Sequence, residues 1–365
     1  MTLALVEVEK NTRSAMESKF LGETGVIIVG GGQAGLSVGR YLKEFGHPFI
    51  ILDKNDGIGV SWRNRYDSLV LDSFAKYSQL EDFPFNIDPM RQASKDEVVS
   101  YLQSFAKYYD ITPHFYTEVL NIEKHNNEFI VKTNKGFYKA KFVVLATGPF
   151  QQPLIPKASE YISKEICQIH SNDYKNPSQL KPGSVLVVGR GNSGTEIVEE
   201  LLESSREVLF SFKGKLKSVK SSFFSQWLAY RLGLAHIPKH TIFGKLILWY
   251  TKGKAVGVDI KKLLSSPKIK IIGEFLGVAD GGIIFSKGKI RKIANIIWAT
   301  GYESDFSIVS IPNFNPEIQK RGVTNIRGLF LLNIRWQYSK SSSHLAGVSR
   351  DAKYIARYII DKSRK

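Results

Sequence analysis

The sequence predicts an α/β protein of two doubly wound domains, the second inserted in the first. Three observations carry this prediction. The chain of 365 residues has the length of about two domains. A glycine-rich strand-to-helix motif occurs twice, and an Ala-Thr-Gly segment also occurs twice after a strand-like run. The apolar content of 43% is enough for full hydrophobic cores, which excludes a disordered or fibrous chain.

The internal repeat is the most informative feature. Residues 26–42 (VIIVGGGQAGLSVGRYL) and 185–201 (VLVVGRGNSGTEIVEEL) align without a gap, 159 residues apart. Each begins with a β-branched apolar run, typical of a buried parallel strand, and ends with apolar residues at helical spacing. The glycines between follow the G-x-G-x-x-G pattern of Rossmann-like dinucleotide sites.

Each glycine of that pattern has its own role. The first permits the tight turn, the second lets the backbone approach a pyrophosphate, and the third lets helix and strand pack closely. The phosphates then lie at the helix N-terminus, where N–H groups and the helix dipole favour an anion. The candidate residues are Gly30, Gly32, Gln33, Ala34 and Gly35 in the first loop and Gly189, Gly191, Asn192, Ser193 and Gly194 in the second.

The residue 23 positions after the first glycine distinguishes the two copies of the motif. In the first copy it is Asp53, followed by Lys54, at the end of a strand-like run over 47–52, where a carboxylate can accept hydrogen bonds from ribose hydroxyls. In the second copy it is Phe212, with Lys213 beside it. A 2′-phosphate is repelled by an acid and attracted by a cation, so the first site suits FAD and the second NADPH. The alternative for Lys213 is an ordinary solvated lysine in a lysine-rich stretch, so NADH stays open.

The Ala-Thr-Gly segments complete the domain prediction. Small residues at a strand end let the backbone press against a dinucleotide, and the candidates are Ala146, Thr147, Gly148, Ala299, Thr300 and Gly301. The predicted organisation is an N-terminal extension (1–22), a FAD-binding domain (23–155 and 293–365) and an inserted NAD(P)H-binding domain (156–292). Residues 117–148 are expected to form an antiparallel meander that returns to the parallel sheet. Helices are expected over 96–109, capped by Ser94, and over 344–360.

The charge is concentrated in one segment. Residues 211–270 hold thirteen Lys and Arg against one acid, Asp259, and so carry +12 of the net +17. We expect a basic helical excursion over about 214–265 that covers the NADPH site and attracts the dinucleotide. Peripheral contact with an anionic membrane is a second reading of this segment. Nucleic-acid binding is not expected, because no recognition motif accompanies the charge.

Other features narrow the class of protein. The lone Cys167 excludes a disulfide framework and a dithiol redox pair. The sequence contains no metal-binding motif, so no metal is expected. Residues 1–22 mix charged and apolar side chains and do not resemble a signal peptide. Together these observations favour a cytoplasmic protein.

The ordered motifs resemble those of the flavin-containing monooxygenases, a family that includes the plant indole-pyruvate monooxygenases. Lys164 and Ile166 stand where the family's linker motif has Phe and Gly, whereas His170 and Tyr174 match it. The linker lacks the Trp-Pro of the Baeyer–Villiger branch, which argues against ketone oxygenation. The resemblance covers residue 24 to the C-terminus through the segments 26–36, 51–54, 59–69, 145–156, 169–177, 185–197, 296–302, 328–339 and 344–359.

The resemblance implies an activity and further site residues. It implies hydride transfer from NADPH to FAD, then reaction with O₂ to a C4a-(hydro)peroxyflavin that oxygenates a small nitrogen- or sulfur-containing nucleophile. The flavin supplies this chemistry, so no catalytic side chain is expected. The alternatives are a flavin reductase or electron-transfer oxidoreductase without oxygenation, and a non-catalytic flavoprotein at a membrane surface. The further cofactor-binding candidates are Ser61, Trp62, Arg63, Val119, Gln337 and Leu345, the last through the N–H groups that begin the helix at 344.

Overall fold

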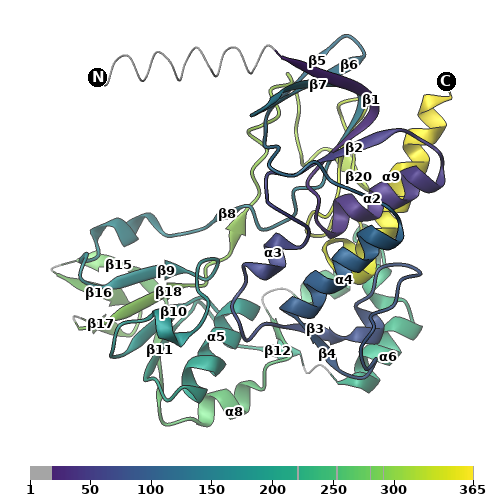
Figure 1. Ribbon diagram of the computed structural model, residues 1–365. Helices are drawn as coiled ribbons and strands as arrows, with labels where there is room; N and C mark the ends of the chain where they lie inside the picture. Colours follow the sequence, from purple (N-terminus) through teal and green to yellow (C-terminus); the bar gives the residue numbers. More distant parts are fainter. Residues whose placement is uncertain (1–18, 220–221, 252–253, 280, 291, 365) are drawn as a thin grey trace, which may run out of the picture.

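The computed structural model describes residues 19–219, 222–251, 254–279, 281–290 and 292–364. Its chain forms two main sheets built around parallel strands, each with helices packed on one face, at opposite ends of the molecule (Figure 1). The predicted α/β class with two doubly wound units is therefore confirmed. A narrow antiparallel pair joins the two ends, formed by β8 (Gln152–Pro153) and β19 (Tyr302–Glu303).

The first sheet is built on β1, which pairs in parallel with β2 and β7. Side chains of β1 alternate between two cores, as expected for a strand buried on both faces. Val26 and Ile28 pack toward the helices, and Ile27 and Val29 pack on the opposite face. In sheet order the strands are β2 (Phe49–Leu52), β1 (Phe20–Val29), β7 (Gly136–Leu145), β22 (Leu329–Leu331), β21 (Val323–Thr324) and β20 (Gln319–Lys320), with β6 (Glu128–Thr133) and β5 (Val119–His125) continuing from β7.

Three helices cover one face of this sheet. The first follows the glycine loop and packs beside the last helix of the chain (Figure 1). The strands β5, β6 and β7 form the antiparallel meander expected over 117–148, and β7 re-enters the parallel sheet next to β1. The three helices are α2 (Gln33–Glu44), α4 (Lys95–Tyr108) and α9 (Leu345–Ser363).

The second sheet repeats this plan around β10. Val185 and Val187 pack toward α5, and Leu186 and Val188 pack on the opposite face. An antiparallel three-stranded sheet contributes to that second face. The strands in order are β14 (Ile269–Gly273), β11 (Val208–Ser211), β10 (Val185–Val188), β18 (Asn295–Trp298) and β9 (Cys167–His170), followed along the chain by α5 (Asn192–Glu203) after β10 and by β15 (Phe275–Ala279), β16 (Gly282–Phe285) and β17 (Gly288–Ile290) after β14.

Two predicted domain boundaries need correction. β18 pairs with β10 and β9, so residues 295–298 belong to the second sheet, and the chain returns to the first domain after Gly301 rather than at 293. A buried strand followed by Ala-Thr-Gly occurs in both sheets, so this sequence pattern alone could not assign β18 to one of them. At the other end, Phe20 already pairs with Phe137, so the predicted extension ends earlier than residue 22. Residues 1–18 lie outside the described residues.

The basic excursion is largely helical and reaches back to the first domain. Phe223 packs on Phe74 and Tyr77, and the Gln226 amide hydrogen-bonds the backbone of β3. Residues 220–221 and 252–253 of the excursion lie outside the described part of the chain. Its elements are β12 (Ser218–Val219), α6 (Phe223–Arg231), the 3-10 turn η4 (Leu234–His236), α7 (Ile242–Thr251), β13 (Ala255–Val256) and α8 (Ile260–Ser265).

The remaining elements are short. They lie mainly between the first glycine loop and α4, in the linker before β10, and ahead of α9. Among the described residues, none of the helices combines the length and the apolar content needed to cross a membrane. These elements are α3 (Val60–Arg63), β3 (Val70–Phe74), η1 (Ala75–Tyr77), β4 (Gln92–Ser94), η2 (Lys157–Tyr161), η3 (Pro177–Gln179) and η5 (Lys340–Ser343).

Replacing Ser94 by alanine should destabilise the protein by about 1 kcal/mol. Ser94 begins α4 with a reciprocal capping box, in which its hydroxyl accepts from the Glu97 N–H at 3.3 Å and the Glu97 carboxylate accepts from the Ser94 N–H at 2.9 Å. Urea unfolding of the parent and of Ser94→Ala measures the change. Ser100→Ala, on the exposed side of the same helix, is the control and should not destabilise. Equal midpoints for Ser94→Ala and the parent would contradict the prediction.

Candidate dinucleotide sites

The first glycine loop closes by backbone packing against backbone. Gly30 has φ +106°, and a Cβ on it would lie 2.6 Å from the Ala146 carbonyl oxygen. A Cβ on Gly35 would lie 1.9 Å from the Gly30 carbonyl oxygen. Neither position has room for a side chain, because the strand-to-helix turn, the start of α2 and the end of β7 meet there. The Ala-Thr-Gly segment therefore supports the loop from the neighbouring strand.

The middle glycine of the loop is different. A Cβ on Gly32 would meet no atom within 4 Å, so the space in front of α2 is open. Gly32 is the N-cap and offers no side chain to the N–H groups of the first turn, which begins with Gln33 and Ala34. Free N–H groups facing open space at a helix N-terminus are suited to an anion.

The second loop has the same geometry. Gly189 has φ +119°, and its Cβ would lie 2.1 Å from the Ala299 carbonyl oxygen. A Cβ on Gly194 would lie 2.0 Å from the Gly189 carbonyl oxygen, and one on Gly191 would meet nothing within 4 Å. Each loop is thus supported by an Ala-Thr-Gly segment at the end of the adjacent parallel strand. The segments continue through Thr147 and Gly148 (φ +79°) in the first domain and Thr300 and Gly301 (φ +92°) at the second.

Asp53 lies beside the first loop, at the end of β2. One carboxylate oxygen accepts from the Gly31 N–H at 2.6 Å, and the other accepts from the N–H and side-chain amide of Asn55 at 2.8 Å each. A carboxylate has about four acceptor positions, so these three bonds orient the group and leave acceptor capacity. Asp53 is 8% exposed, which places it at the rim of the loop where a ribose hydroxyl would be expected.

The other predicted residues near the first loop differ in exposure. Trp62, on α3, packs against the cores of both domains, so it lies at their junction. Val119 is buried with Val29 and Leu52 at the ends of β1 and β2. The side chains of Lys54 and Ser61 are exposed, and Arg63 forms an exposed ion pair with Asp56 at 2.6 Å.

Unpaired buried polar atoms gather near the start of α9. Gln337 is 2% exposed and its side-chain N–H₂ has no hydrogen-bond partner among the described residues. Asn333, with φ +69°, likewise leaves its side-chain oxygen unpaired, and its amide nitrogen lies 3.8 Å from where a Cβ of Gly148 would be. Buried polar atoms normally have partners, so both side chains are suited to a polar ligand. The sequence analysis included Gln337 and missed Asn333.

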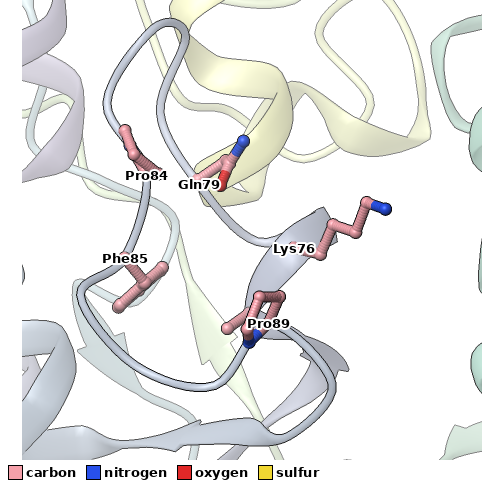
Figure 2. A pocket seen from close by; sticks show the side chains of 6 residues that line it. Lys76, Gln79, Pro84, Phe85 and Pro89 are labelled. Carbon is pink, nitrogen blue, oxygen red and sulfur yellow. The ribbon is translucent and has the colours of Figure 1, made fainter.

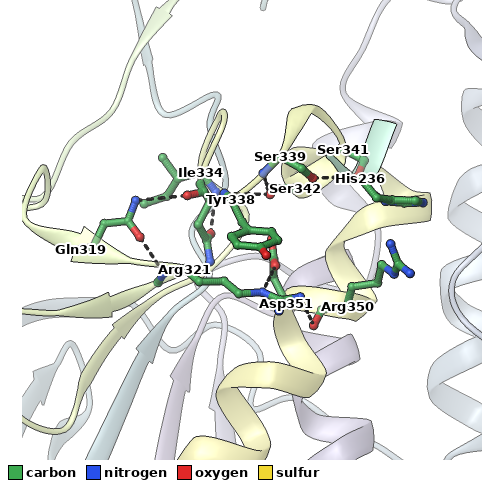
Figure 3. Close-up of polar contacts among 12 residues, drawn as sticks. His236, Gln319, Arg321, Ile334, Tyr338, Ser339, Ser341, Ser342, Arg350 and Asp351 are labelled. Atoms are coloured by element: carbon green, nitrogen blue, oxygen red, sulfur yellow. Dashed lines mark hydrogen bonds and ion pairs between the residues drawn. The ribbon is translucent and has the colours of Figure 1, made fainter. Parts of the chain in front are cut away.

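The segment that carries Gln337 is held rigidly. The Ser342 hydroxyl accepts from the Tyr338 and Ser339 N–H groups at 3.1 and 3.0 Å, and Arg321 pairs with Asp351 on α9 at 2.8 Å (Figure 3). Leu345 is the first residue of α9, and its own side chain is buried in the core. The Gln33 amide donates to the Ser343 carbonyl at 3.5 Å, so α2 and α9 begin next to each other.

The cations at the second loop are arranged differently from the prediction. Lys213 is 82% exposed and forms an ion pair with Glu274 at 3.4 Å, an acid that sequence spacing could not place there. Arg190, inside the loop, donates to the Lys215 carbonyl at 2.6 Å and so lies beside the same segment. Ser211, at the end of β11, has a buried hydroxyl without a partner among the described residues. Arg190 and Ser211 are candidates that the sequence analysis missed, although a cation between the first two glycines was visible.

Asn192 ties the second loop to the first domain. Its amide donates to the Asp72 carboxylate on β3 at 2.5 Å, and its oxygen accepts from the Val256 N–H at 3.2 Å. Burial and the nearby Glu196 raise the pKa of Asp72 to about 7, although Lys340 and Asn192 oppose the shift. Burial also raises the pKa of Glu196, whose carboxylate accepts from the Tyr66 hydroxyl. The sequence analysis missed both carboxyls, because neither stands out in the sequence and their surroundings form only when the two domains pack together.

Further contacts at the same junction involve predicted residues. The Arg65 guanidinium donates to the Tyr302 hydroxyl at 2.6 Å and to the Ser193 hydroxyl at 3.4 Å. His170 is 1% exposed: its Nδ1 accepts from the Asn172 N–H, so its Nε2 donates to the Gly301 carbonyl at 3.1 Å. Burial lowers the pKa of His170, which keeps the ring neutral. These contacts make His170 a structural residue of the linker.

Away from the two loops, the described residues form a surface pocket but no metal cluster. A shallow pocket lies in the 75–89 segment of the first domain, away from both glycine motifs in the sequence (Figure 2). Within the described ranges, no group of His, Cys, Asp and Glu side chains is arranged to hold a metal ion. The residues that line the pocket are Ala75, Lys76, Gln79, Pro84, Phe85 and Pro89.

Comparisons with known proteins agree with this arrangement. The model of the pyridine nucleotide-disulphide oxidoreductase family matches residues 27–234. An uncharacterized oxidoreductase, CzcO-like, from Geobacillus kaustophilus is 39% identical over 92% of this chain and 98% of its own. The probable indole-3-pyruvate monooxygenase YUCCA3 of Arabidopsis thaliana is 30% identical over 77% of this chain and 74% of its own.

A solved structure shares the fold. The flavin-containing monooxygenase from Stenotrophomonas maltophilia superposes with a TM-score of 0.77 over 94% of this chain and 100% of its own, at 20% identity. The two-domain arrangement therefore persists where most side chains differ.

Asp72→Asn should remove a pH dependence of stability. The folded-state pKa of Asp72 lies at about 7 and its ordinary value at 3.8, so the protonated carboxyl stabilises the fold fully below about pH 4. That contribution is lost as the pH rises from about 4 to about 7. Asparagine stays neutral and its oxygen can still accept from Asn192, so the variant should gain stability relative to the parent across this interval.

Chemical denaturation at a series of pH values measures this difference. Asp361→Asn removes an exposed carboxyl from α9 and serves as the control for net charge. If the difference in unfolding free energy between Asp72→Asn and the parent were constant from about pH 4 to about pH 7, the assigned shift would be wrong.

Proposed function

Because the chain belongs to the pyridine nucleotide-disulphide oxidoreductase family, we propose that this FAD- and NADPH-dependent oxidoreductase oxygenates a small nitrogen- or sulfur-containing nucleophile with O₂. The observation that carries the proposal is the pair of glycine loops with the same backbone geometry, one in each sheet. One loop would hold a resident dinucleotide and the other a dinucleotide that exchanges. The monooxygenase assignment is supported by the relationship to the indole-3-pyruvate monooxygenases.

The residues of the first domain fit FAD. Open space at Gly32 faces the N-terminus of α2, where a pyrophosphate would accept from the first N–H groups. Asp53 would bind the adenosine ribose. The unpaired atoms of Asn333 and Gln337 would bind the isoalloxazine, with the N–H groups that begin α9 next to its polar edge. Bound FAD would accept a hydride from NADPH and supply the oxygen chemistry.

The residues of the second domain fit NADPH. The open space at Gly191 repeats that at Gly32, and the buried hydroxyl of Ser211 lies at the strand end where the adenosine ribose would be expected. Arg190 supplies a cation next to this position. Because Arg190 lies inside the glycine loop whereas Lys213 is 82% exposed and pairs with Glu274, we propose that Arg190 contributes more than Lys213 to recognition of the 2′-phosphate.

The chain's own residues would contribute to the reaction by positioning the two dinucleotides. Arg65, Tyr302 and Ser193 connect the first domain to the second loop. Asn192 and Asp72 make a second connection a few residues away. These contacts would hold the two dinucleotides at a set separation, which hydride transfer requires. Trp62, packed against both cores, would help to exclude water from the junction.

Gly32→Ala and Gly191→Ala should separate the two sites. A Cβ at either position meets no protein atom within 4 Å, so each variant should fold normally while filling the space of a pyrophosphate. Gly32→Ala should lose FAD, measured by flavin absorbance of the purified protein. Gly191→Ala should keep FAD and raise the KM for NADPH by about tenfold or more. Each variant is the control for the other, and loss of flavin from both would contradict the assignment.

Arg190→Ala should reduce the preference for NADPH over NADH by about tenfold. Only NADPH carries a 2′-phosphate for this guanidinium to contact, so kcat/KM with NADH should change little. Lys213→Ala should have a smaller effect, because Glu274 already neutralises this lysine. Stopped-flow flavin reduction with each coenzyme measures the ratio, with Lys157→Ala at an exposed position of η2 as the control. A uniform loss with both coenzymes would exclude 2′-phosphate recognition by Arg190.

Oxygenation itself is tested by rapid mixing. The protein, reduced with NADPH without air, is mixed with O₂, and its near-ultraviolet absorbance is followed. A long-lived absorbance before reoxidation, and incorporation of labelled molecular oxygen into a thioether or amine, are expected for a monooxygenase. Immediate reoxidation with no labelled product from thioethers, amines or indole-pyruvate would replace this proposal with a flavin reductase.

A further inference from the structure

The outer side of α6 and α7 is an exposed apolar surface. Ile242 is 83% exposed, Trp249 74%, Phe243 69% and Phe224 68%. Leu246 and the neighbouring turns add further exposed apolar side chains. In α7, Gly244 is the residue that is buried, so the helix presents apolar side chains nearly all round. A helix of this composition normally lies in a protein core or in a membrane. We call this surface, formed by α6, η4 and α7, the α6–α7 surface.

The inner side of α6 and the turn that precedes α7 are attached to the first domain. Phe223 and Tyr230 pack on Tyr77, with ring centroids 5.5 and 5.3 Å apart. His236 Nδ1 lies 2.8 Å from the Ser341 hydroxyl next to α9 (Figure 3). The Lys239 N–H donates to the Tyr338 carbonyl at 2.7 Å. α6 and the turn before α7 are thus fixed to the first domain, and the apolar side chains of α7 stay exposed.

The charge of this region has a single sign. Residues 222–251 contain Arg231, Lys239 and Lys245 and no Asp or Glu. Lys254, just beyond α7, lies with its ammonium 3.2 Å from the centroid of the Tyr250 ring. Apolar and aromatic side chains are therefore interleaved with cations alone. Tryptophan and tyrosine beside lysine are typical of segments that lie at the boundary between lipid headgroups and acyl chains.

We propose that the α6–α7 surface docks this protein on an anionic lipid membrane. The apolar side chains of α7 would enter the headgroup region, and Arg231, Lys239 and Lys245 would contact anionic headgroups. The ten residues of α7 span about 15 Å, half the hydrocarbon thickness of about 30 Å, so the helix would lie in the interface. A second copy of the chain fits less well, since a symmetric interface would bring these cations together without acids to pair them.

Vesicle binding by the full-length holoprotein tests the proposal. Vesicles of phosphatidylcholine alone are compared with vesicles of equal parts phosphatidylcholine and phosphatidylglycerol, by co-sedimentation. Binding to the anionic vesicles and its loss at high salt are expected. Lys245→Glu should weaken the binding by about tenfold or more. Trp227 and Trp249 should report insertion by a blue shift of fluorescence in the bound state.

Paired variants distinguish binding through this surface from nonspecific adsorption of the protein to vesicles. Ile242→Asp/Leu246→Asp alters the proposed surface, and Leu276→Asp/Ile318→Asp places the same charges at exposed apolar positions elsewhere. Flavin content and reduction by NADPH should be unchanged in both pairs, which shows that they fold. Only the first pair should lose vesicle binding.

Three outcomes would overturn the proposal. They are no binding of the parent to anionic vesicles at low salt, equal loss of binding in both variant pairs, and a dimer in lipid-free solution that only Ile242→Asp/Leu246→Asp dissociates. The last outcome would identify the occupant as a second copy of the chain. None of these measurements depends on whether the protein oxygenates a substrate.

Discussion

The structure depends on backbone packing at two glycine loops. In each domain the first glycine touches the carbonyl of an alanine on the next strand, and the third glycine touches the carbonyl of the first. A side chain at any of these four positions would separate strand, helix and neighbouring strand. Because the contacts are this close, the second glycine of each loop is left facing open space at a helix N-terminus. One constraint thus produces both the packing of each domain and the form of its proposed dinucleotide site.

The two sites are useful only if the domains keep their relative position. The covalent connection is narrow, a short antiparallel pair between β8 and β19. Polar contacts reinforce it at the second loop, where Arg65 binds Tyr302 and Asn192 binds Asp72. The basic excursion adds a third connection through α6, which packs on Phe74 and Tyr77. The same elements that present an apolar surface outward therefore also hold the domains together.

The site residues that the sequence analysis predicted differ in kind from the candidates that it missed. Gly191 and Asp53 were predicted as site residues because each is tied to a local pattern of fixed spacing. Asp72, Glu274 and Asn333 have no such pattern, and they matter only because distant segments fold together. Asp72 on β3 contacts the second loop, Glu274 after β14 pairs with Lys213, and Asn333 after β22 lies near Gly148. β18 was assigned to the wrong sheet for a related reason, since strands ending in Ala-Thr-Gly occur in both.

The sequence by itself determined the number of dinucleotide loops, the fold class and the position of the basic segment, because glycine spacing, strand composition and charge are local properties. The tertiary structure alone decided which sheet receives β18, which acid pairs with Lys213 beside the second loop, and which side chains of α6 and α7 are exposed. Those outcomes depend on contacts between residues far apart in the chain. The free energies of these contacts come from burial of apolar surface and from pairing of polar groups, which arise only when the segments pack together.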